Sequence, residues 1–453
     1  MSNFGDVARS INDAEKLANM YLQYYFKGKE ISYPINPFQM LLNEDVRFVM
    51  RDFGKLEGVY IPAENTDDID IVGINFNRPI TRQRFTAAHE LCHYFREPDQ
   101  QMCPISGKKT NVEKYADAFA AGILMPIKDL RAQVKKRLNG RYIDFDDVLI
   151  IADYFGVSFE TCLFRIAYKI HAISGNTESR ELKKRAQKYR PDDRRKDLGL
   201  NNVILYEGLI DSYTHALCLK PTTFMFNVFQ NDYIYNDSRM EGVDTDIETA
   251  SEIVTDIRLN KQGSQYCSEE NEAYLSIAGH SVMYNYIFET AGQDRCSVYD
   301  TIILNRKLFS YFPHPEFGGN LRQTNTLVLG AKFETIDYHE IMTELSKINS
   351  DIDKSYECYA KQPISDYIKF IVKLHHKLTV IHPFVDGNGR TLRAFFNTML
   401  IRNRITPMYI KVENKDEYLK ALSIADLNED YVPLYEFFFK MIIRSNSELT
   451  RDD

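Results

Sequence analysis

The segment 364–400 constrains the fold of this chain more than any other, because two helical patterns meet there at a loop that cannot itself be helical. Before the loop, apolar residues recur at helical spacing: Ile364, Tyr367, Ile368, Ile371, Leu374, Leu378 and Ile381. Pro383 ends this helix, since proline lacks the N–H that a helix needs. The run Asp386-Gly387-Asn388-Gly389 permits a left-handed turn, and a second apolar stripe predicts a new helix from about Arg390.

This loop has the chemistry of a phosphate site. A glycine-rich turn that leads into a helix N-terminus binds anions, because free N–H groups and the helix dipole both point at the ligand. Arg390 and Arg393 lie three residues apart on the new helix and can hold phosphate oxygens. Asp386 offers a hard oxygen for Mg²⁺, and His382 can act as a base near neutral pH. Together they predict transfer of part of a nucleoside triphosphate onto a hydroxyl group.

The run from His382 to Arg393 resembles the Fic family signature, HxFx[D/E]GNGRxxR, at every fixed position. The resemblance implies a mainly α-helical Fic domain with a small β-hairpin flap. It also implies transfer of AMP from ATP, with Mg²⁺, to a Ser, Thr or Tyr hydroxyl of a target protein. His382 would activate that hydroxyl and Asp386 would hold Mg²⁺. The residues that would bind the nucleotide phosphates are Gly387, Asn388, Gly389, Arg390 and Arg393, with Arg393 on the γ-phosphate.

Residues 318–336 predict a short hairpin around Gly330. The position of this segment resembles that of the family's flap, which orders a target segment by adding a strand to it. An ordinary surface hairpin is the alternative interpretation.

Residues 237–242 resemble an inhibitory pattern that many Fic proteins carry, [S/T]xxxE[G/N]. Glu241 and Gly242 match its ending, whereas Asp237 replaces the Ser or Thr, and we expect it to cap a helix N-terminus in their place. The resemblance implies that Glu241 pairs with Arg393, displaces the γ-phosphate and keeps the enzyme inactive. A glutamate at an ordinary helix end is the alternative.

A second group of chemically active residues lies near the N-terminus. The segment 82–95 has helical spacing, and its His89 and His93, four residues apart, project from one face so that both can bind one Zn²⁺. Glu90 stands beside them and can take a proton from a metal-bound water. The next predicted helix, 111–125, offers Glu113 and Asp117 as candidates for a third ligand.

The segments 84–94, 113–126 and 152–158 resemble the ImmA/IrrE metallopeptidase family. The resemblance implies an α+β zincin-like domain in which His89, His93 and Glu113 bind zinc and Glu90 is the catalytic base. Asp117 competes with Glu113 for the role of third ligand. Members of this family often cleave or control a transcriptional regulator, which makes such a regulator or an antitoxin a candidate partner.

The 453-residue chain therefore divides into a peptidase-like domain at 1–180, a charged linker and connecting segment at 181–224, and a Fic domain at 225–453. Its formal net charge of −8 argues against general nucleic-acid binding. A basic nucleic-acid-binding stretch within 176–198 is a weaker interpretation, because acidic residues are interleaved there. Seven scattered cysteines predict reduced thiols in a cytoplasmic protein, and no apolar run is long enough for a membrane span.

Three alternatives to AMP transfer remain open from the sequence. Proteolysis is the first, with the Fic half as its regulator. The second is different chemistry at the Fic site, either removal of AMP with Glu241 aligning a water or transfer of another moiety. The third is a non-enzymatic role, with partner binding through the helices at 145–170. The target protein, the nucleotide base and the oligomeric state are not encoded in any residue pattern that we identify.

Overall fold

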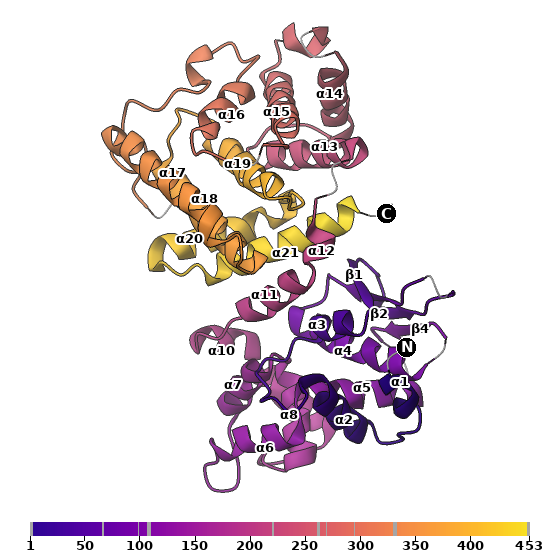
Figure 1. Cartoon of the computed structure of the whole chain (residues 1–453). Helices are drawn as coiled ribbons and strands as arrows, with labels where there is room; N and C mark the ends of the chain where they lie inside the picture. Colours follow the sequence, from indigo (N-terminus) through magenta and orange to yellow (C-terminus); the bar gives the residue numbers. More distant parts are fainter. Residues whose placement is uncertain are drawn as a thin grey trace. The chain divides into compact units, whose positions relative to one another are not determined.

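The computed structural model describes residues 3–65, 68–97, 99–106, 110–219, 222–260, 263–268, 270–293, 295–328 and 333–450. The chain forms two compact units, Met1–Tyr213 and Thr214–Asp453 (Figure 1). The first unit combines a small sheet with helices, and the second is mainly helical. The predicted fold class, an α+β domain followed by a mainly α-helical one, is confirmed.

The first unit contains one four-stranded sheet in the order β1-β3-β2-β4. β1 and β3 are parallel, whereas β2 runs antiparallel to both β3 and β4. The elements are α1 (Asn3–Ala8), α2 (Ala14–Phe26), α3 (Pro37–Asn43), β1 (Arg47–Arg51), β2 (Leu56–Ile61), β3 (Ile71–Asn75), α4 (Ile80–Arg96), β4 (Gln101–Pro104), α5 (Asn111–Leu124), α6 (Ile127–Lys135), α7 (Phe145–Phe155), α8 (Phe159–Arg165), α9 (Ser179–Tyr189), α10 (Pro191–Asp197) and α11 (Val203–Ser212).

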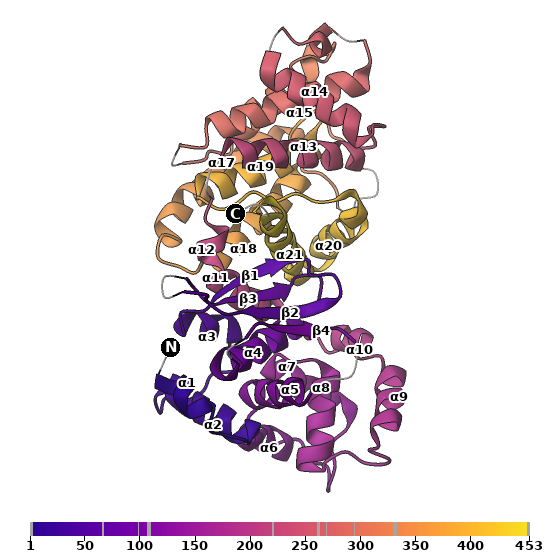
Figure 2. The same ribbon diagram turned by 90° about the vertical axis from the view of Figure 1, so that its right-hand side faces the viewer.

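The helix α4 forms the layer next to the sheet, where it packs on β2 and β3 while α3 packs on β1 (Figure 2). The helix α5 packs against α4, and α2 packs against α5. The segments 47–50 and 69–75, whose alternating β-branched residues predict strands, form most of β1 and contain all of β3, and the helix predicted at 111–125 is confirmed. Only helices were predicted between residues 82 and 170, so β4 was missed. It is a four-residue strand with one buried side chain, too short to show an alternating pattern.

The charged segment at 176–198 forms α9 and α10 and belongs to the first unit. Several of its charges are paired: Arg194 binds the carboxylate of Asp146 on α7 with an Nη2–Oδ2 distance of 2.6 Å, and Tyr189 donates to the same carboxylate at 2.6 Å. Arg195 pairs with Asp153, which lies about two helix turns after Asp146 on α7. Amino-acid composition alone does not distinguish a solvent-exposed charged linker from charged helices whose side chains form ion pairs within a domain.

The second unit is built around one buried helix, α19, which packs against α16 and α18 (Figure 1). The helices α13, α14 and α15 pack against one another beside it. The elements are α12 (Thr214–Leu217), α13 (Thr223–Met240), α14 (Ile247–Asn260), α15 (Glu272–Glu289), α16 (Asp300–Leu308), α17 (Ile341–Cys358), α18 (Ile364–Ile381), α19 (Asn388–Arg402), α20 (Lys415–Asn428) and α21 (Val432–Leu449). The predicted helix over 364–381 is confirmed.

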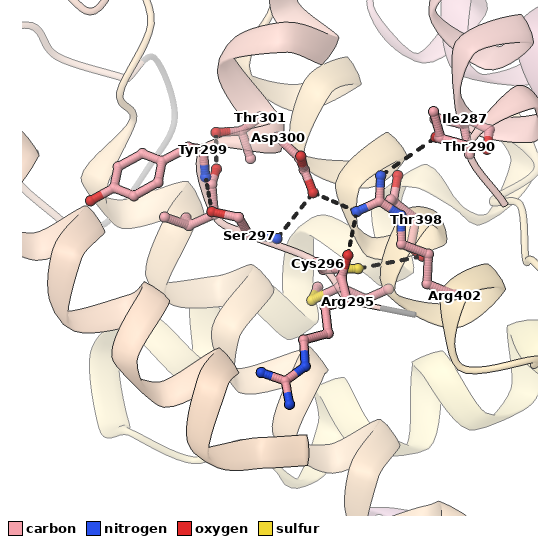
Figure 3. Close-up of polar contacts among 12 residues, drawn as sticks. Ile287, Thr290, Arg295, Cys296, Ser297, Tyr299, Asp300, Thr301, Thr398 and Arg402 are labelled. Carbon is pink, nitrogen blue, oxygen red and sulfur yellow. Dashed lines mark hydrogen bonds and ion pairs between the residues drawn. The ribbon is translucent and has the colours of Figure 1, made fainter. Parts of the chain in front are cut away.

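Polar contacts fasten the C-terminal end of α19 (Figure 3). Arg402 donates from Nη1 to the Asp300 carboxylate at 2.6 Å and to the Arg295 carbonyl at 2.8 Å. A cation at the end of a helix also opposes the partial negative charge of the helix dipole there. Cys296 is buried beside this pair, with its thiol 3.8 Å from the Thr398 carbonyl. These contacts hold α19 in place at the end opposite its glycine-rich loop.

The segment predicted as a hairpin is only partly described, since its centre at Gly330 lies in 329–332, outside the described residues. The described arms contain no regular strand. The Thr335 hydroxyl donates to the Thr326 carbonyl at 2.5 Å, and Asn325 donates to the Asp337 carboxylate at 3.1 Å. Side chains therefore link the two arms. No helix in the described part of the chain is both long enough and apolar enough to cross a membrane.

Candidate active sites in the two units

The glycine-rich loop of the second unit joins α18 to α19 with two residues in left-handed conformation. His382 follows the last residue of α18 with φ 49°, and Gly387 precedes α19 with φ 73°. A Cβ at Gly387 would lie 2.8 Å from side-chain carbons of Leu308 and Phe309, so both the backbone angle and the available space require glycine. The loop is thus tightly packed rather than free.

Two asparagines hold this loop. Asn388 accepts from the Phe384 N–H and donates to the Phe384 carbonyl, both at 2.9 Å, so its side chain closes the loop on itself. Asn305 on α16 donates to the Asp386 carbonyl at 3.1 Å and accepts from the Gly319 N–H at 2.8 Å. The side chain of Asn388 is already hydrogen-bonded within the loop and cannot also bind an anion. The backbone N–H groups of the first turn of α19 are therefore the groups suited to bind one.

Arg322 connects the segment after Gly319 to His382. Its guanidinium donates to the His382 carbonyl at 2.8 Å and to the Ile381 carbonyl at 3.1 Å, and it also binds the carbonyls of Thr324 and Ile336. It is almost fully buried. One side chain thus satisfies carbonyls at the end of α18 and on both arms of the predicted flap.

The His382 imidazole is held in its neutral form. Burial lowers its pKa below the ordinary value, and the positive charge of Arg322 lowers it further. A neutral imidazole near pH 7 can accept a proton.

Replacing Arg322 with methionine is expected to raise the pKa of His382, because a neighbouring positive charge is removed. That pKa should stay below 6.5, since burial remains. Titration of the histidine ring signals by NMR measures it. Arg322→Lys is the matched control, which keeps a charge and should keep the pKa lower than Arg322→Met does. An unchanged pKa in Arg322→Met would contradict this account.

The two arginines of the loop lie on α19 and are both bound by side chains from other helices. Arg390 donates from Nη1 to the Ser276 hydroxyl on α15 at 2.6 Å. Arg393 binds two carboxylates of α13: its Nε contacts Asp237, and its Nη2 lies 2.5 Å from Glu241 Oε1. Burial alone would raise the pKa of Glu241, but the charge and hydrogen bond of Arg393 bring it below its ordinary value. Glu241 is therefore an ionised partner of Arg393.

The Glu241 carboxylate lies directly over the glycine-rich loop. A Cβ at Gly389 would be 2.5 Å from Glu241 Oε1 and 2.9 Å from Arg393 Nη1. The ion pair thus fills the space above the N-terminus of α19 where an anion would bind. The expected capping role of Asp237 is wrong, because Asp237 lies near the C-terminal end of α13 and Thr222 caps the N-terminus of that helix.

Asp386 is exposed at this loop, and one of its carboxylate oxygens accepts from the Gly387 N–H at 2.7 Å. A carboxylate oxygen is a hard donor. A single carboxylate beside a phosphate site fits Mg²⁺, which keeps several waters and shares phosphate oxygens.

The zinc-ligand candidates of the first unit converge on one point. His89 and His93 on α4 have their Nε2 atoms 3.1 Å apart, and the Glu113 carboxylate on α5 lies 3.3 Å from the first and 3.4 Å from the second. These three donors form a buried set that could hold a metal ion. Asp117 instead lies 3.2 Å from His89 Nδ1, the ring nitrogen that faces away from this point. Two imidazoles and a carboxylate are a donor set that suits Zn²⁺.

Glu90 is fully buried beside these donors, and its carboxylate oxygens accept no hydrogen bond from the described residues. Burial raises its pKa to about 8. A buried carboxylate without hydrogen-bond partners destabilises the fold unless a ligand or water binds it. A metal-bound group between Glu90 and the histidines would supply such a partner. Cys103 on the edge strand β4 lies in the same cluster as His89 and Glu90.

No sequence pattern pointed to Ser276, Asn305 or Cys103 at these sites, because each lies outside the motif that it contacts. Arg322 lies in the segment 318–336 that was predicted as a hairpin, but no pattern there indicated its contact with the His382 carbonyl. His375 and His376 on α18 are buried and take part in packing: His375 is bonded to Tyr418, and His376 to Tyr431 and Asp426.

Two family models match the chain. The IrrE N-terminal-like domain matches residues 43–167, and the Fic/DOC family matches residues 296–400. The first range includes α4 and α5, and the second includes the glycine-rich loop.

Several curated relatives match part of the chain. Protein adenylyltransferase Fic of Nematostella vectensis is 25% identical over 213 residues, which are 45% of this chain and 45% of that relative. Protein adenylyltransferase fic-1 of Caenorhabditis elegans is 28% identical over 136 residues, 30% of this chain and 25% of that relative. The chain thus spans less than half the length of these relatives. A solved Fic-domain-containing signalling protein of Bacteroides thetaiotaomicron has a TM-score of 0.45 and 20% identity, and covers 54% of this chain and 95% of its own. The chain carries an IrrE N-terminal-like domain followed by a Fic domain.

Proposed function

We propose that the second unit is a protein adenylyltransferase, which transfers AMP from ATP to a protein hydroxyl, and that Glu241 inhibits it. One observation carries the proposal: His382, the loop at Gly389 and the two arginines surround one helix N-terminus, and the Glu241 carboxylate occupies the anion space there. The names of the relatives agree with this activity.

The proposed reaction needs one proton acceptor and several phosphate ligands. His382 takes the proton of the target hydroxyl, whose oxygen then forms a bond to the α-phosphorus. The bond between that phosphorus and the α–β bridging oxygen breaks, and pyrophosphate leaves. Backbone N–H groups at Gly389, together with Arg390, offset its charge, and Arg393 contacts the phosphates once Glu241 has left it. The substrate is ATP with Mg²⁺, and Asp386 is the protein ligand suited to that ion.

Replacing Glu241 with glycine should increase AMP transfer, because it frees the Nη2 side of Arg393 and the space over Gly389. The measurement is autoradiography after incubation with α-³²P-ATP and Mg²⁺, with added lysate as a source of targets. Glu429→Gly is the matched control, since Glu429 is also the C-cap residue of a helix and lies outside the site. Label should increase in Glu241→Gly, and not in the control.

The proposal would be overturned if neither the parent protein nor Glu241→Gly transferred label from ATP, and if labelled nucleotides with other bases also gave no transfer. Loss of label from an AMP-modified protein would instead indicate AMP removal. An AMP-modified protein would therefore be supplied in parallel.

The first unit carries a second candidate function, a zinc peptidase, which the convergence of His89, His93 and Glu113 favours. Bound zinc would polarise a water and a peptide carbonyl. Glu90 would hold a proton at its carboxylate, and Asp117 would orient His89 through Nδ1. Glu90→Gln should abolish cleavage of a substrate and keep the metal.

A target protein that presents a Ser, Thr or Tyr hydroxyl is part of this proposal. A transcriptional regulator or antitoxin is proposed as the partner of the first unit, on the resemblance to the ImmA/IrrE family alone. A cytoplasmic location agrees with the six cysteines whose side chains are described, all of which are free thiols.

A further inference from the structure

Arg393 is bound by two carboxylates that differ in their exposure and in their position on α13. Glu241 follows the last residue of α13, its side chain is 32% exposed, and Gly242 comes next with φ 86°. Asp237 lies inside the helix one turn earlier, and its side chain is only 4% exposed. Glu241 can therefore swing away from Arg393 with a small backbone change, whereas Asp237 cannot leave without unfolding the end of α13.

Asp237 forms a direct, buried ion pair with Arg393. Burial raises the pKa of Asp237 above its ordinary value, while the charge and hydrogen bond of Arg393 oppose that rise. The second oxygen of Asp237 lies 3.4 Å from His280 Nε2 on α15. Burial, and then the charges of Arg390 and Arg393, hold the pKa of His280 well below its ordinary value, so this ring is neutral. Burial alone would lower the pKa of Arg393, but both carboxylates raise it, so the arginine stays charged. The buried ion pair between Asp237 and Arg393 is neutral overall, and it does not need Glu241 to be so.

We propose that Asp237 is a specificity-determining residue that neutralises Arg393 permanently and so weakens the preference of this site for a third phosphate. This inference rests on the proposed nucleotide site. Arg390, whose guanidinium binds the neutral Ser276 hydroxyl, keeps its charge for the phosphates nearer the loop. A γ-phosphate would meet Arg393 only after Glu241 leaves, and would still face the Asp237 carboxylate. The family pattern has Ser or Thr at this position, so the second carboxylate is a departure of this chain.

The test measures affinity for ATP and for ADP by calorimetry, in the full-length chain. The two proteins compared are the single variant Glu241→Gly and the double variant that carries Glu241→Gly and Asp237→Asn. Asparagine keeps the shape and an acceptor for Arg393 Nε, so the change removes charge alone. Loss of a buried unit charge beside a phosphate should tighten ATP binding by about tenfold. ADP affinity should change much less, so the ratio of ATP to ADP affinity should rise.

Asp237→Ser in the same background is the second variant. Serine is the residue of the family pattern and is smaller than aspartate, so this protein can be measured if the Asp237→Asn protein does not fold. An ATP-to-ADP affinity ratio that stays unchanged or falls in the folded variants would overturn the inference and leave the proposed function intact. A fall would mean that Asp237 mainly positions Arg393. No binding of either nucleotide to any variant would overturn both the inference and the proposed function.

Discussion

Replacing His382 with alanine in the Glu241→Gly background should lower the rate of AMP transfer by about 10²- to 10⁴-fold, the usual contribution of a general base. The structure gives the reason: burial and Arg322 keep the imidazole neutral, and the αL backbone at the end of α18 fixes its position. The affinity for ATP should change little, because the phosphates are bound by α19 and its arginines. Initial rates of labelling and calorimetric ATP binding measure the two effects separately.

The control for this loss is His314→Ala, an exposed histidine of the same unit, which should label at the rate of its parent. A His382→Ala protein that binds ATP and labels at the rate of its parent would refute the role of His382. The sign of the pH dependence follows from the lowered pKa. Transfer should persist below pH 6.5 and decline only as His382 becomes protonated at lower pH.

Replacing Glu113 with glutamine should weaken zinc binding far more than replacing Asp117 with asparagine. Glu113 has its carboxylate within 3.4 Å of both histidine Nε2 atoms, as a direct ligand would. Asp117 contacts only His89 Nδ1, so its loss should cost about 10- to 100-fold in affinity, as for other partners of metal-bound histidines. Competition with a chelating dye measures both affinities, and His93→Ala should bind no zinc under the same conditions.

The matched control is Glu160→Gln, an exposed glutamate of the same unit, which should bind zinc as the parent does. A larger loss of zinc affinity in Asp117→Asn than in Glu113→Gln would show that Asp117 is the direct ligand and Glu113 the partner of His89. Equal and full zinc binding in all three variants would place the metal elsewhere. These measurements do not depend on a peptidase substrate, which is unidentified.

The sequence by itself determined the local elements that carry each site. Helical spacing over 364–381, a proline and two glycines were sufficient to predict a helix, a loop and a new helix N-terminus, because these residues restrict their own backbone. Two histidines one turn apart on a helix predict a metal-binding face for the same local reason. The strand β4 was missed, since four residues carry too little periodicity.

Contacts between distant segments were decided only by the tertiary structure. The sequence left Glu113 and Asp117 as alternatives, and only the packing of α5 against α4 places Glu113 at the histidine Nε2 atoms. The motif predicted that Glu241 pairs with Arg393, and the structure adds Asp237 on the same guanidinium. No local pattern encodes these distances. They depend on how the hydrophobic faces of separate helices pack, which involves the whole unit at once.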